Sequence, residues 1–408
     1  MNLNTIFTLG EYKNLFVAET FCEKDGNIGI PKKDFDALET NILTHEKNVA
    51  QFFRPTYKKN FGKCLEARNF VGILRFRNGV TIEILPKIVG ADREETRKTF
   101  LKMLSRLRNS PFFDFDEASL KNIKMPILEF FISLFCHETE KIIKTGLRRA
   151  YVQKTENQNF LKGKLDFKNH IRQNFIHRER FFVNFDEFSE NLPENKIIKT
   201  ALQFLYSISC NSKNMKRLRE SLFIFDEVSF SRDFDSDFQS ICRDRDFSRY
   251  EKILSWCRIF LKKEGISTFC GGTVSFSLLF DMNRVFEDFV ADFFRKSGRK
   301  VAAQKSGKYL VELPKKRFAL RPDLILDDSE ITDTKWKMID SEASDGKIGI
   351  SQSDLYQMFA YGKKFQKKEL MLIYPKSEKF LKSVPEKFSF GDEELQIVCF
   401  DCERGEIL

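Results

Sequence analysis

The sequence of 408 residues lacks long, uninterrupted runs of apolar residues. One of its best runs, Ile127 to Cys136, contains Glu129, whereas a helix that spans a membrane needs about 20 apolar residues. The N-terminus also lacks the basic start, the long apolar stretch and the small-residue cleavage site of a secretory signal. We therefore expect a cytoplasmic protein that does not interact with membranes.

Cysteine and histidine are too few and too scattered to predict a disulfide framework or a metal site. The nine cysteines are an odd number spread over a long chain, which is typical of reduced thiols. Only Cys399 and Cys402 are close, and no second pair completes the four ligands of a structural zinc ion. We interpret Cys399 as part of a terminal strand. His170 and His177 are seven residues apart and do not predict a metal site either.

The sequence also has no nucleotide-binding loop of the form GxxxxGK[ST] and no internal repeat. We therefore do not expect the chain to hydrolyse a nucleotide by itself. Hydrophobic residues make up 42% of the chain and charged residues 31%, which predicts an ordinary folded protein. The length predicts two to three domains. We interpret the 45 phenylalanines as core residues and not as a surface that stacks on bases.

Positive charge is present in excess, and it is concentrated in one segment. The formal net charge of the chain is +10, and residues 141–180 hold 11 basic and three acidic side chains, a local balance of +8. Clustered Lys and Arg with interleaved Phe160, Phe167 and Phe175 suit a polyanion, because each neutralised phosphate releases counterions. A solvated face on a mixed surface is the alternative, and charge alone does not decide between the two.

The periodicity of apolar residues predicts a mixed α/β fold in three regions. Residues 70–88 alternate on both sides of Asn78-Gly79, which predicts an antiparallel hairpin that ends at Pro86. Helical spacing predicts helices over 35–53, 93–108, 123–148, 194–210 and 247–263. We therefore expect a β-rich N-terminal region over 1–120 and a mostly helical middle region over 121–270 that carries the basic segment.

The third predicted region covers residues 271–408, after the boundary marked by Gly271-Gly272. Its order is a helix (281–296), strands (300–312, 318–326 and 330–337), a helix (351–365) and two strands (369–374 and 395–400).

Two acids and a lysine in this third region form the pattern that predicts chemistry. Asp323 opens a strand, and ten residues later Asp333 and Lys335 stand two apart, so they face the same side of their strand while Thr334 points away. A hairpin of these strands brings Asp323 beside Asp333. Two adjacent carboxylates call for a hard cation such as Mg²⁺, which acidifies a water for attack on a phosphodiester. Lys335 would orient that water or stabilise the charge that develops on the phosphate.

The pattern PD…DxK resembles the PD-(D/E)xK nuclease fold, whose element order the third region matches. The resemblance implies that Asp323, Asp333, Glu287 on the preceding helix and the carbonyl of Thr334 hold Mg²⁺, or Mn²⁺ in its place. Gln357 and Tyr361 are four residues apart on one face of the following helix. Such a pair resembles the RecB-type branch of these nucleases, where it orients the site or the DNA.

Further stretches resemble the McrC family, the nuclease subunits of McrBC modification-dependent restriction systems, over nearly the whole chain. They include VGILRFRNGVTIEILPKI (71–88), FLKGKLDF (160–167), NKIIKTAL (195–202), MNRVFEDFV (282–290), RPDLIL (321–326), DTKWK (333–337) and DLYQMFAY (354–361). The family implies a DNA endonuclease that needs a hexameric McrB-type AAA+ GTPase. It also implies that the N-terminal region, 1–120, docks onto this partner and stimulates its GTP hydrolysis. GTP is then bound by the partner, which also recognises the modified base.

Two alternatives remain open at this stage. A GTPase-activating scaffold with a decayed nuclease site would stimulate the partner without cutting DNA. An autonomous RecB-type nuclease would cut DNA with Mg²⁺ and no partner.

Overall fold

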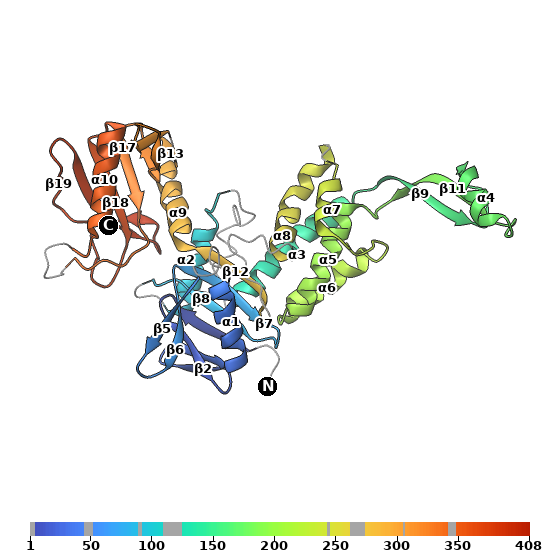
Figure 1. Cartoon of the computed structure of the whole chain (residues 1–408), viewed down its shortest axis with the longest axis horizontal. Coiled ribbons are helices and arrows are strands. Elements are labelled where there is room, and N and C mark those ends of the chain that lie inside the picture. Colours follow the sequence, from blue (N-terminus) through green and yellow to red (C-terminus); the bar gives the residue numbers. More distant parts are fainter. Residues whose placement is uncertain are drawn as a thin grey trace. The chain divides into compact units, whose positions relative to one another are not determined.

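The computed structural model describes residues 5–44, 52–88, 92–108, 125–242, 245–261, 274–304, 307–341 and 348–408. Both helices and strands occur along the chain (Figure 1), which confirms the predicted mixed α/β class. Two compact units are present: Met1–Ile127 with Gly265–Leu408 form unit 1, and Leu128–Glu264 form unit 2. Within these described ranges, no helix is both long and apolar enough to cross a membrane.

Unit 1 begins with a five-stranded sheet in the order β3-β4-β2-β6-β5. Its strands are β2 (Asn14–Ala18), β3 (Cys22–Lys24), β4 (Asn27–Pro31), β5 (Phe53–Lys58) and β6 (Gly62–Ala67). Helix α1 (Lys32–Thr44) contacts β2 and β4, and its buried Leu38 and Ile42 are part of the predicted apolar stripe. The prediction carried this helix to Phe53, which is instead the first residue of β5. Residues 45–51 of that prediction lie outside the described part.

A four-stranded sheet follows, in the order β1-β8-β7-β12. Its strands are β1 (Ile6–Gly10), β7 (Phe70–Phe76), β8 (Thr81–Leu85) and β12 (Val274–Asp281). The predicted hairpin is confirmed, since β7 and β8 are antiparallel and β8 ends immediately before Pro86. Gly79 takes a positive φ of +88°, while the Asn78 side chain accepts a hydrogen bond from the Val80 N–H at 3.1 Å. The Phe76 N–H donates to the Val80 carbonyl at 2.8 Å, so residues 77–79 form a three-residue loop that ends in a left-handed glycine.

Strand β12 comes from a distant part of the chain, because all of unit 2 lies between it and its partner β7. The third predicted region starts at 271, yet its first strand completes the sheet of the N-terminal region. The division into three regions remains a prediction, and the residues around 120 and 270 lie outside the described ranges.

The C-terminal part of unit 1 is built on a seven-stranded sheet in the order β13-β16-β17-β18-β20-β19, with β21 paired to β20. Its strands are β13 (Val301–Ala303), β16 (Leu324–Leu326), β17 (Glu330–Thr334), β18 (Glu369–Pro375), β19 (Phe388–Ser389), β20 (Glu394–Asp401) and β21 (Glu406–Ile407). Strands β17, β18 and β20 are parallel, whereas β13, β16 and β17 are antiparallel neighbours. Helix α9 (Met282–Lys296) contacts β13 and β17, and helix α10 (Gln352–Phe365) contacts β17 and β18.

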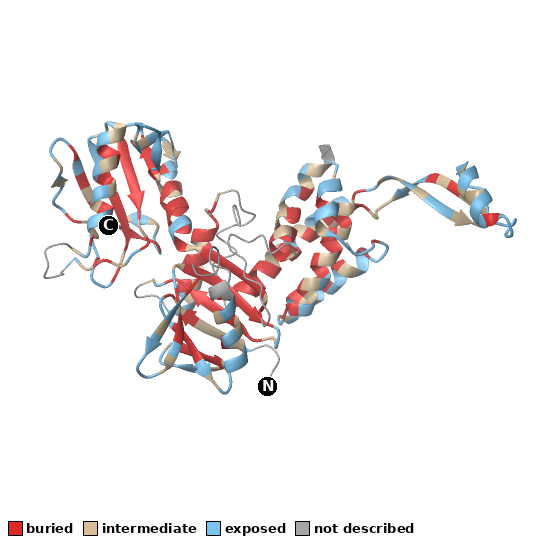
Figure 2. Cartoon of the chain, viewed as in Figure 1, coloured by how far each residue is buried: buried red, intermediate tan, exposed pale blue. Residues whose placement is uncertain are grey.

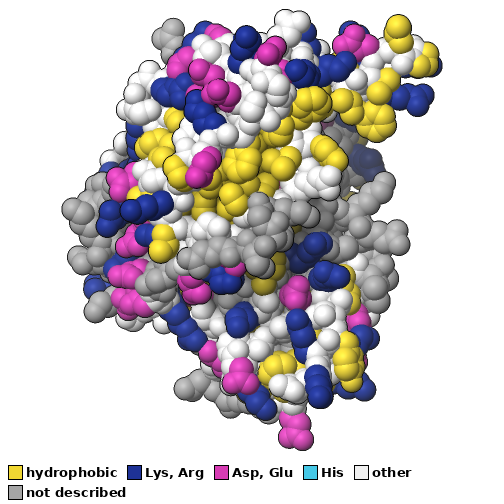
Figure 3. All heavy atoms as spheres, turned by 90° about the vertical axis from the view of Figure 1, so that its left-hand side faces the viewer, with side chains coloured by type: hydrophobic (Ala, Val, Ile, Leu, Met, Phe, Trp, Pro, Cys, Tyr) yellow, Lys and Arg dark blue, Asp and Glu magenta, His cyan; other side chains and the backbone are white. Residues whose placement is uncertain are grey.

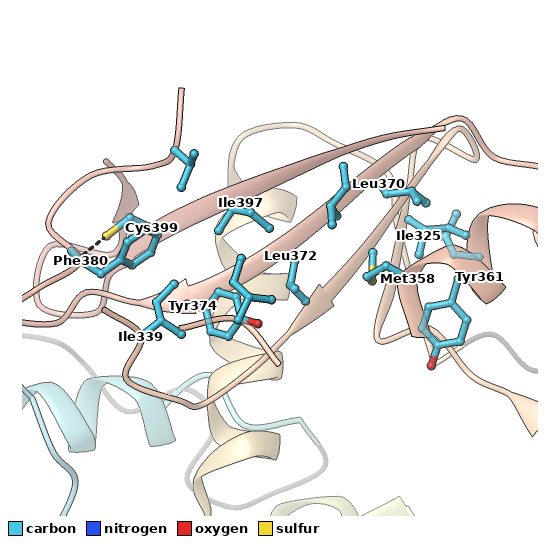
Figure 4. Packing of buried hydrophobic residues seen from close by; sticks show 14 residues of the cluster. Ile325, Ile339, Met358, Tyr361, Leu370, Leu372, Tyr374, Phe380, Ile397 and Cys399 are labelled. Carbon is cyan, nitrogen blue, oxygen red and sulfur yellow. Dashed lines mark hydrogen bonds between the residues drawn. The ribbon is translucent and has the colours of Figure 1, made fainter. Parts of the chain in front are cut away.

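The core of this sheet explains why its central strands read as apolar runs. Strands buried on both faces lose the alternation of half-exposed strands, and β18 and β20 are buried along most of their length (Figure 2). The side chains of Leu370, Leu372 and Ile397 belong to one buried cluster with Met358 and Tyr361 of α10 (Figure 4). The core therefore fixes the helix that presents Gln357 and Tyr361 to the sheet.

Two predicted strands of this region are each divided. The predicted strand 300–312 consists of β13 and β14 (Lys308–Val311), and 318–326 consists of β15 (Arg317–Leu320) and β16. Gln304 has a left-handed φ of +49° directly after β13, and Pro322, which has no N–H for a ladder, separates β15 from β16. Strands β14 and β15 pair with each other in a separate two-stranded sheet.

Helix α2 (Arg93–Leu104) completes the helices of unit 1 and begins with a capping box formed by Asp92 and Glu95.

Unit 2 consists of helices and one small sheet. Its helices are α3 (Ile127–Thr145), α4 (Phe167–Asn174), α5 (Pro193–Ile208), α6 (Ser212–Ile224), α7 (Phe234–Ser240), the 3₁₀ helix η2 (Arg245–Tyr250) and α8 (Glu251–Leu261). Its strands are β9 (Ala150–Gln158), β10 (Lys164–Leu165) and β11 (Phe181–Ser189), in the order β10-β11-β9. The predicted helices at 93–108, 123–148, 194–210 and 247–263 are confirmed as α2, α3, α5 and α8.

The basic segment 141–180 begins in α3 and continues through β9, β10 and α4. We define the β9–β11 module as residues 150–189. Many of its side chains are exposed, as Figure 2 shows by colour along β9, β11 and α4.

Candidate active site

The hairpin of β16 and β17 brings the two predicted carboxylates together. Leu324 pairs with Thr332 in antiparallel register, so Asp323, one residue before, and Asp333, one residue after, are neighbours across the two strands. Asp333 is only 1% exposed. Burial raises the pKa of Asp333, and the negative charge of Asp323 acts in the same direction.

Asp323 is held by the backbone and the side chain of Thr334. Its Oδ2 accepts a hydrogen bond from the Thr334 N–H at 2.8 Å and another from the Thr334 hydroxyl at 2.9 Å. The expectation that Thr334 points away from the site is therefore wrong, because its hydroxyl reaches across to the neighbouring strand. Burial raises the pKa of Asp323, and these two hydrogen bonds oppose that effect.

Lys335 lies on the same side of its strand as Asp333, as the alternation of side chains predicts. The Lys335 Nζ is 2.6 Å from the Asp333 Oδ2, and it donates a hydrogen bond of 3.0 Å to the Gln357 Oε1. Burial lowers the pKa of Lys335, but the charges of Asp333 and Asp323 outweigh burial and raise it overall. The ammonium is therefore kept charged beside the two acids.

Helix α10 supplies the remaining polar contacts, and the predicted pair on one of its faces is confirmed by a direct hydrogen bond. The Gln357 Nε2 donates to the Tyr361 hydroxyl at 2.7 Å. That hydroxyl in turn donates to the carbonyl of Arg321 at 3.0 Å, two residues before Asp323. A continuous chain of contacts thus runs from the Arg321 backbone through Tyr361 and Gln357 to Lys335.

Glu287 lies on α9, close enough to Asp323 for their charges to interact. Burial, together with the negative charge of Asp323, raises the pKa of Glu287 to about 7. Its Oε2 accepts a hydrogen bond of 3.1 Å from the Gln304 Nε2. Three acids with raised pKa values in one region indicate a site that a cation would stabilise.

Gln304 was not predicted, although it joins both sides of the site. Besides Glu287, its side chain accepts a hydrogen bond from the Arg321 guanidinium, and its N–H donates to the Asp323 carbonyl at 2.8 Å. A glutamine in a loop has no sequence signal of its own. Its role depends on the left-handed turn that ends β13, which the sequence did not predict.

The residues present fit Mg²⁺ better than a metal that needs a full set of protein ligands. Among the described residues, no group of three or more His, Cys, Asp and Glu side chains could hold a metal ion. Mg²⁺ commonly takes one or two carboxylates and keeps several waters. The paired carboxylates of Asp323 and Asp333 suit that mode, and the role of the Thr334 carbonyl as a ligand remains a prediction. The assignment of Glu287 as a further ligand remains a prediction.

A comparison of the sequence with models of protein families shows to which family the chain belongs. The model of the family "McrBC 5-methylcytosine restriction system component" matches residues 65–375, more than half of the sequence. The chain belongs to this family. The resemblance predicted from the sequence is thereby confirmed. No curated protein matches the sequence.

Solved structures show the same fold as this McrBC family member. One is a refined half-complex from the tetradecameric assembly of Thermococcus gammatolerans McrB AAA+ hexamers with bound McrC. It has a TM-score of 0.70 and 18% identity, and 98% of each chain is covered. Another is the McrBC complex of Thermococcus gammatolerans, with a TM-score of 0.52 and 20% identity over 81% of this chain and 92% of that chain.

Several of the stretches that carried the family resemblance have structural roles in this McrBC family member. The Asn195 Nδ2 donates to the carbonyls of Arg148 and Glu190 at 3.0 and 2.8 Å, which ties α5 to the ends of the β9–β11 module. Gly163 has a φ of +69°, and a Cβ there would lie 2.5 Å from the Asn184 carbonyl oxygen. These motifs therefore specify the fold, whereas RPDLIL and DTKWK contribute the candidate site.

Proposed function

We propose that this chain is the DNA-cutting subunit of a modification-dependent restriction complex. The observation that carries the proposal is the pairing of Asp323 and Asp333 at neighbouring strand ends, with Lys335 in contact with Asp333. Hydrolysis of a phosphodiester needs an activated water and stabilisation of the charge that develops on the phosphate. The site offers groups for both tasks.

In the proposed reaction, Asp323, Asp333 and the Thr334 carbonyl hold Mg²⁺, and Glu287 supports the same site. When bound, Mg²⁺ lowers the pKa of a coordinated water and neutralises charge on the phosphate. Lys335 orients the attacking water or donates to a phosphate oxygen. Gln357 fixes the Lys335 ammonium through its 3.0 Å hydrogen bond, and Tyr361 fixes Gln357. Mn²⁺ is expected to replace Mg²⁺ because it also prefers oxygen ligands.

The partner we propose is a hexameric McrB-type AAA+ GTPase. In the neighbouring Thermococcus gammatolerans structure, McrC is bound to McrB AAA+ hexamers, and the fold of this chain matches over its whole length. We propose that the same association stimulates GTP hydrolysis by the partner, which binds the GTP and recognises the modified base.

In place of the N-terminal region 1–120 expected from the family resemblance, the surface that we assign to this association is the β9–β11 module. It exposes large apolar side chains, which in folded proteins mark sites of protein contact when they are contiguous. They are Tyr151, Phe160, Leu161, Phe167, Ile171, Phe175, Ile176 and Phe188. Such a surface is suited to burial against another protein, and the basic side chains between them suit acidic groups on that protein.

A cleavage assay tests the nuclease. Methylated and unmethylated plasmids are incubated with Mg²⁺ and GTP, with and without the AAA+ partner. We expect wild type to cut only with partner and GTP, and Asp333→Asn to cut at least about 100-fold more slowly, as for loss of a group that stabilises the transition state. The matched control is Asp392→Asn, which removes an exposed acid of the same region.

The other outcomes separate the alternatives. Cutting by the chain alone would favour an autonomous nuclease. Wild type that accelerates the partner's GTP hydrolysis without cutting any substrate would favour a GTPase-activating scaffold. Cutting by Asp333→Asn at the wild-type rate would refute the site.

A further inference from the structure

A small hairpin of unusual composition lies next to the candidate site. Strands β14 and β15 pair in the antiparallel register Lys308–Leu320 and Val311–Arg317. The hairpin is a separate two-stranded sheet, and residues 312–319 are all exposed. Leu320 at the base of the hairpin packs against the core of the seven-stranded sheet. Residues 312–319 add nothing to that core, and their composition needs another explanation.

Two connections fix the base of this hairpin to the site. Strand β15 ends at Leu320, and only Arg321 and Pro322 separate it from Asp323. The Arg321 carbonyl accepts the hydrogen bond from the Tyr361 hydroxyl, so the backbone at the junction is held by α10. Whatever the hairpin binds is therefore brought near the carboxylates.

A third connection joins the hairpin to α10. Strand β14 contacts this helix, and the Glu312 carboxylate is 3.5 Å from the ammonium of Lys364 on α10. Because Glu312 is the only acid of residues 308–320, its pairing leaves the charge of the hairpin dominated by cations.

The free end of the hairpin carries three consecutive basic residues, Lys315, Lys316 and Arg317, all exposed. Over the face of the molecule drawn in Figure 3, by contrast, Lys and Arg side chains are mixed with Asp and Glu side chains. Leu313 and Phe318 flank the three cations and are 84% and 70% exposed. A solvated turn has no need of two exposed large apolar side chains, whereas a surface that meets a nucleic acid uses cations for phosphates and apolar groups for sugars and bases.

We propose that the β14–β15 hairpin binds duplex DNA beside the candidate site and positions the phosphodiester to be cut. Lys315, Lys316 and Arg317 contact backbone phosphates. Leu313 and Phe318 contact the sugars, or the edges of the bases, in the groove between the two phosphate backbones. This inference rests on the proposed nuclease function, but it concerns binding and so can fail separately from the chemistry.

The test measures DNA binding without cleavage. The complete chain is titrated onto a short fluorescent duplex in EDTA, and anisotropy is followed over a range of potassium chloride concentrations. The variant replaces Lys315, Lys316 and Arg317 with Gln. The control variant replaces Lys213, Lys216 and Arg219 with Gln, which removes the same charge from exposed positions of α6.

We expect the hairpin variant to bind duplex DNA of every sequence more weakly than wild type does. The slope of log K against log salt concentration should become shallower by about 1 for each basic side chain removed. The α6 control should keep the wild-type slope. A second variant, Leu313→Ser, should weaken binding while leaving the slope unchanged, since it removes an apolar contact and no charge. All of these positions are exposed, so the thermal unfolding of each variant should match wild type.

The outcomes distinguish the hairpin from the chemistry. An unchanged affinity and slope in the hairpin variant would overturn the inference, as would equal losses in the hairpin and α6 variants or the absence of DNA binding by wild type. If wild type binds through the hairpin but fails to cut in the complete assay with Mg²⁺, GTP and partner, the nuclease proposal fails while the inference stands.

Discussion

Glu11 has a raised pKa like those of Asp333 and Glu287, but in different surroundings. Burial raises its pKa to about 7, and the Trp336 Nε1, which donates to its two oxygens at 3.1 and 3.0 Å, opposes the rise. Trp336 belongs to the DTKWK stretch, so this contact connects the start of the chain to the strand that carries Asp333. The acids around Asp333 lie close together, so a bound cation would stabilise them. Glu11 is a single buried acid, so protonation below about pH 7 removes its charge instead.

The pKa of Glu11 makes the stability of unit 1 depend on pH. A buried acid whose pKa is raised from 4.5 to about 7 keeps its proton longer in the folded state, so the free energy of unfolding falls as pH rises through this range. The full effect is on the order of 3 kcal/mol. We expect Glu11→Gln to keep an acceptor for Trp336 and to flatten this dependence, measured by urea unfolding from pH 4 to pH 8.

The matched control for that experiment is Glu19→Gln, an exposed acid of the same region. It should retain the wild-type pH dependence. If the free energy of unfolding of Glu11→Gln depended on pH as steeply as that of wild type, Glu11 would not be the source of the pH dependence.

Single residues of the site were predictable only where the spacing along the chain determines the contact. Asp333 and Lys335 are two apart on one strand, and Asp323 follows from a hairpin with a short turn. The contact between Glu11 and Trp336 joins residues 325 positions apart, and no local pattern encodes it. Gln304 was missed for the same reason.

At the scale of elements, the close pairing of β7 and β12 depends on one glycine. Gly72 has a φ of +141°, and a Cβ there would lie 2.1 Å from the Leu278 carbonyl oxygen. Since that neighbour is backbone within a ladder, it cannot move without breaking the pairing that completes the four-stranded sheet.

We therefore expect Gly72→Ala to destabilise unit 1 by more than 3 kcal/mol, roughly the range of steric and backbone strain in a packed site. The comparison is Gly62→Ala, where φ is +69° but no atom lies within 4 Å of the added Cβ. That variant should lose only about 1 kcal/mol from backbone strain. Thermal unfolding of both proteins measures the difference, and equal losses would show that the close approach to Leu278 is unimportant.

Elements were predictable where periodicity was strong and uninterrupted. The hairpin at Asn78-Gly79 and helices α2, α3, α5 and α8 follow from alternation or helical spacing. The strands at 300–312 and 318–326 were predicted as continuous, although each is divided in the structure. A left-handed residue at Gln304 divides the first, and Pro322 divides the second.

At the scale of the whole molecule, the β9–β11 module supplies the test of association with the GTPase. Phe175 and Ile176 are 76% and 84% exposed, so replacing both with Ser costs unit 2 no core packing. We expect this variant to lose most of its stimulation of the partner's GTP hydrolysis and its partner-dependent DNA cutting. The control is Phe223→Ser, an equally exposed position on α6 of the same unit. Full stimulation by the Phe175 and Ile176 variant would place the contact elsewhere.

The insertion of unit 2 was beyond prediction because the pairing of β12 with β7 joins residues about 200 positions apart. The composition of the sequence indicates a boundary near residue 270. It does not indicate that the next strand, β12, pairs with β7 in the N-terminal four-stranded sheet.

The position of β12 also has a consequence for biosynthesis. At roughly 5–20 residues per second, a ribosome takes about 10–40 s to progress from β7 to β12. During that time, while unit 2 is being synthesised, the nascent N-terminal sheet has an unpaired edge at β7, where chaperones or other chains can bind. Helix α9, which carries Glu287, starts at the residue after β12. Synthesis of β12 provides the strand that covers the open edge at β7. Synthesis of the next element, α9, then provides Glu287, the first acid of the candidate site.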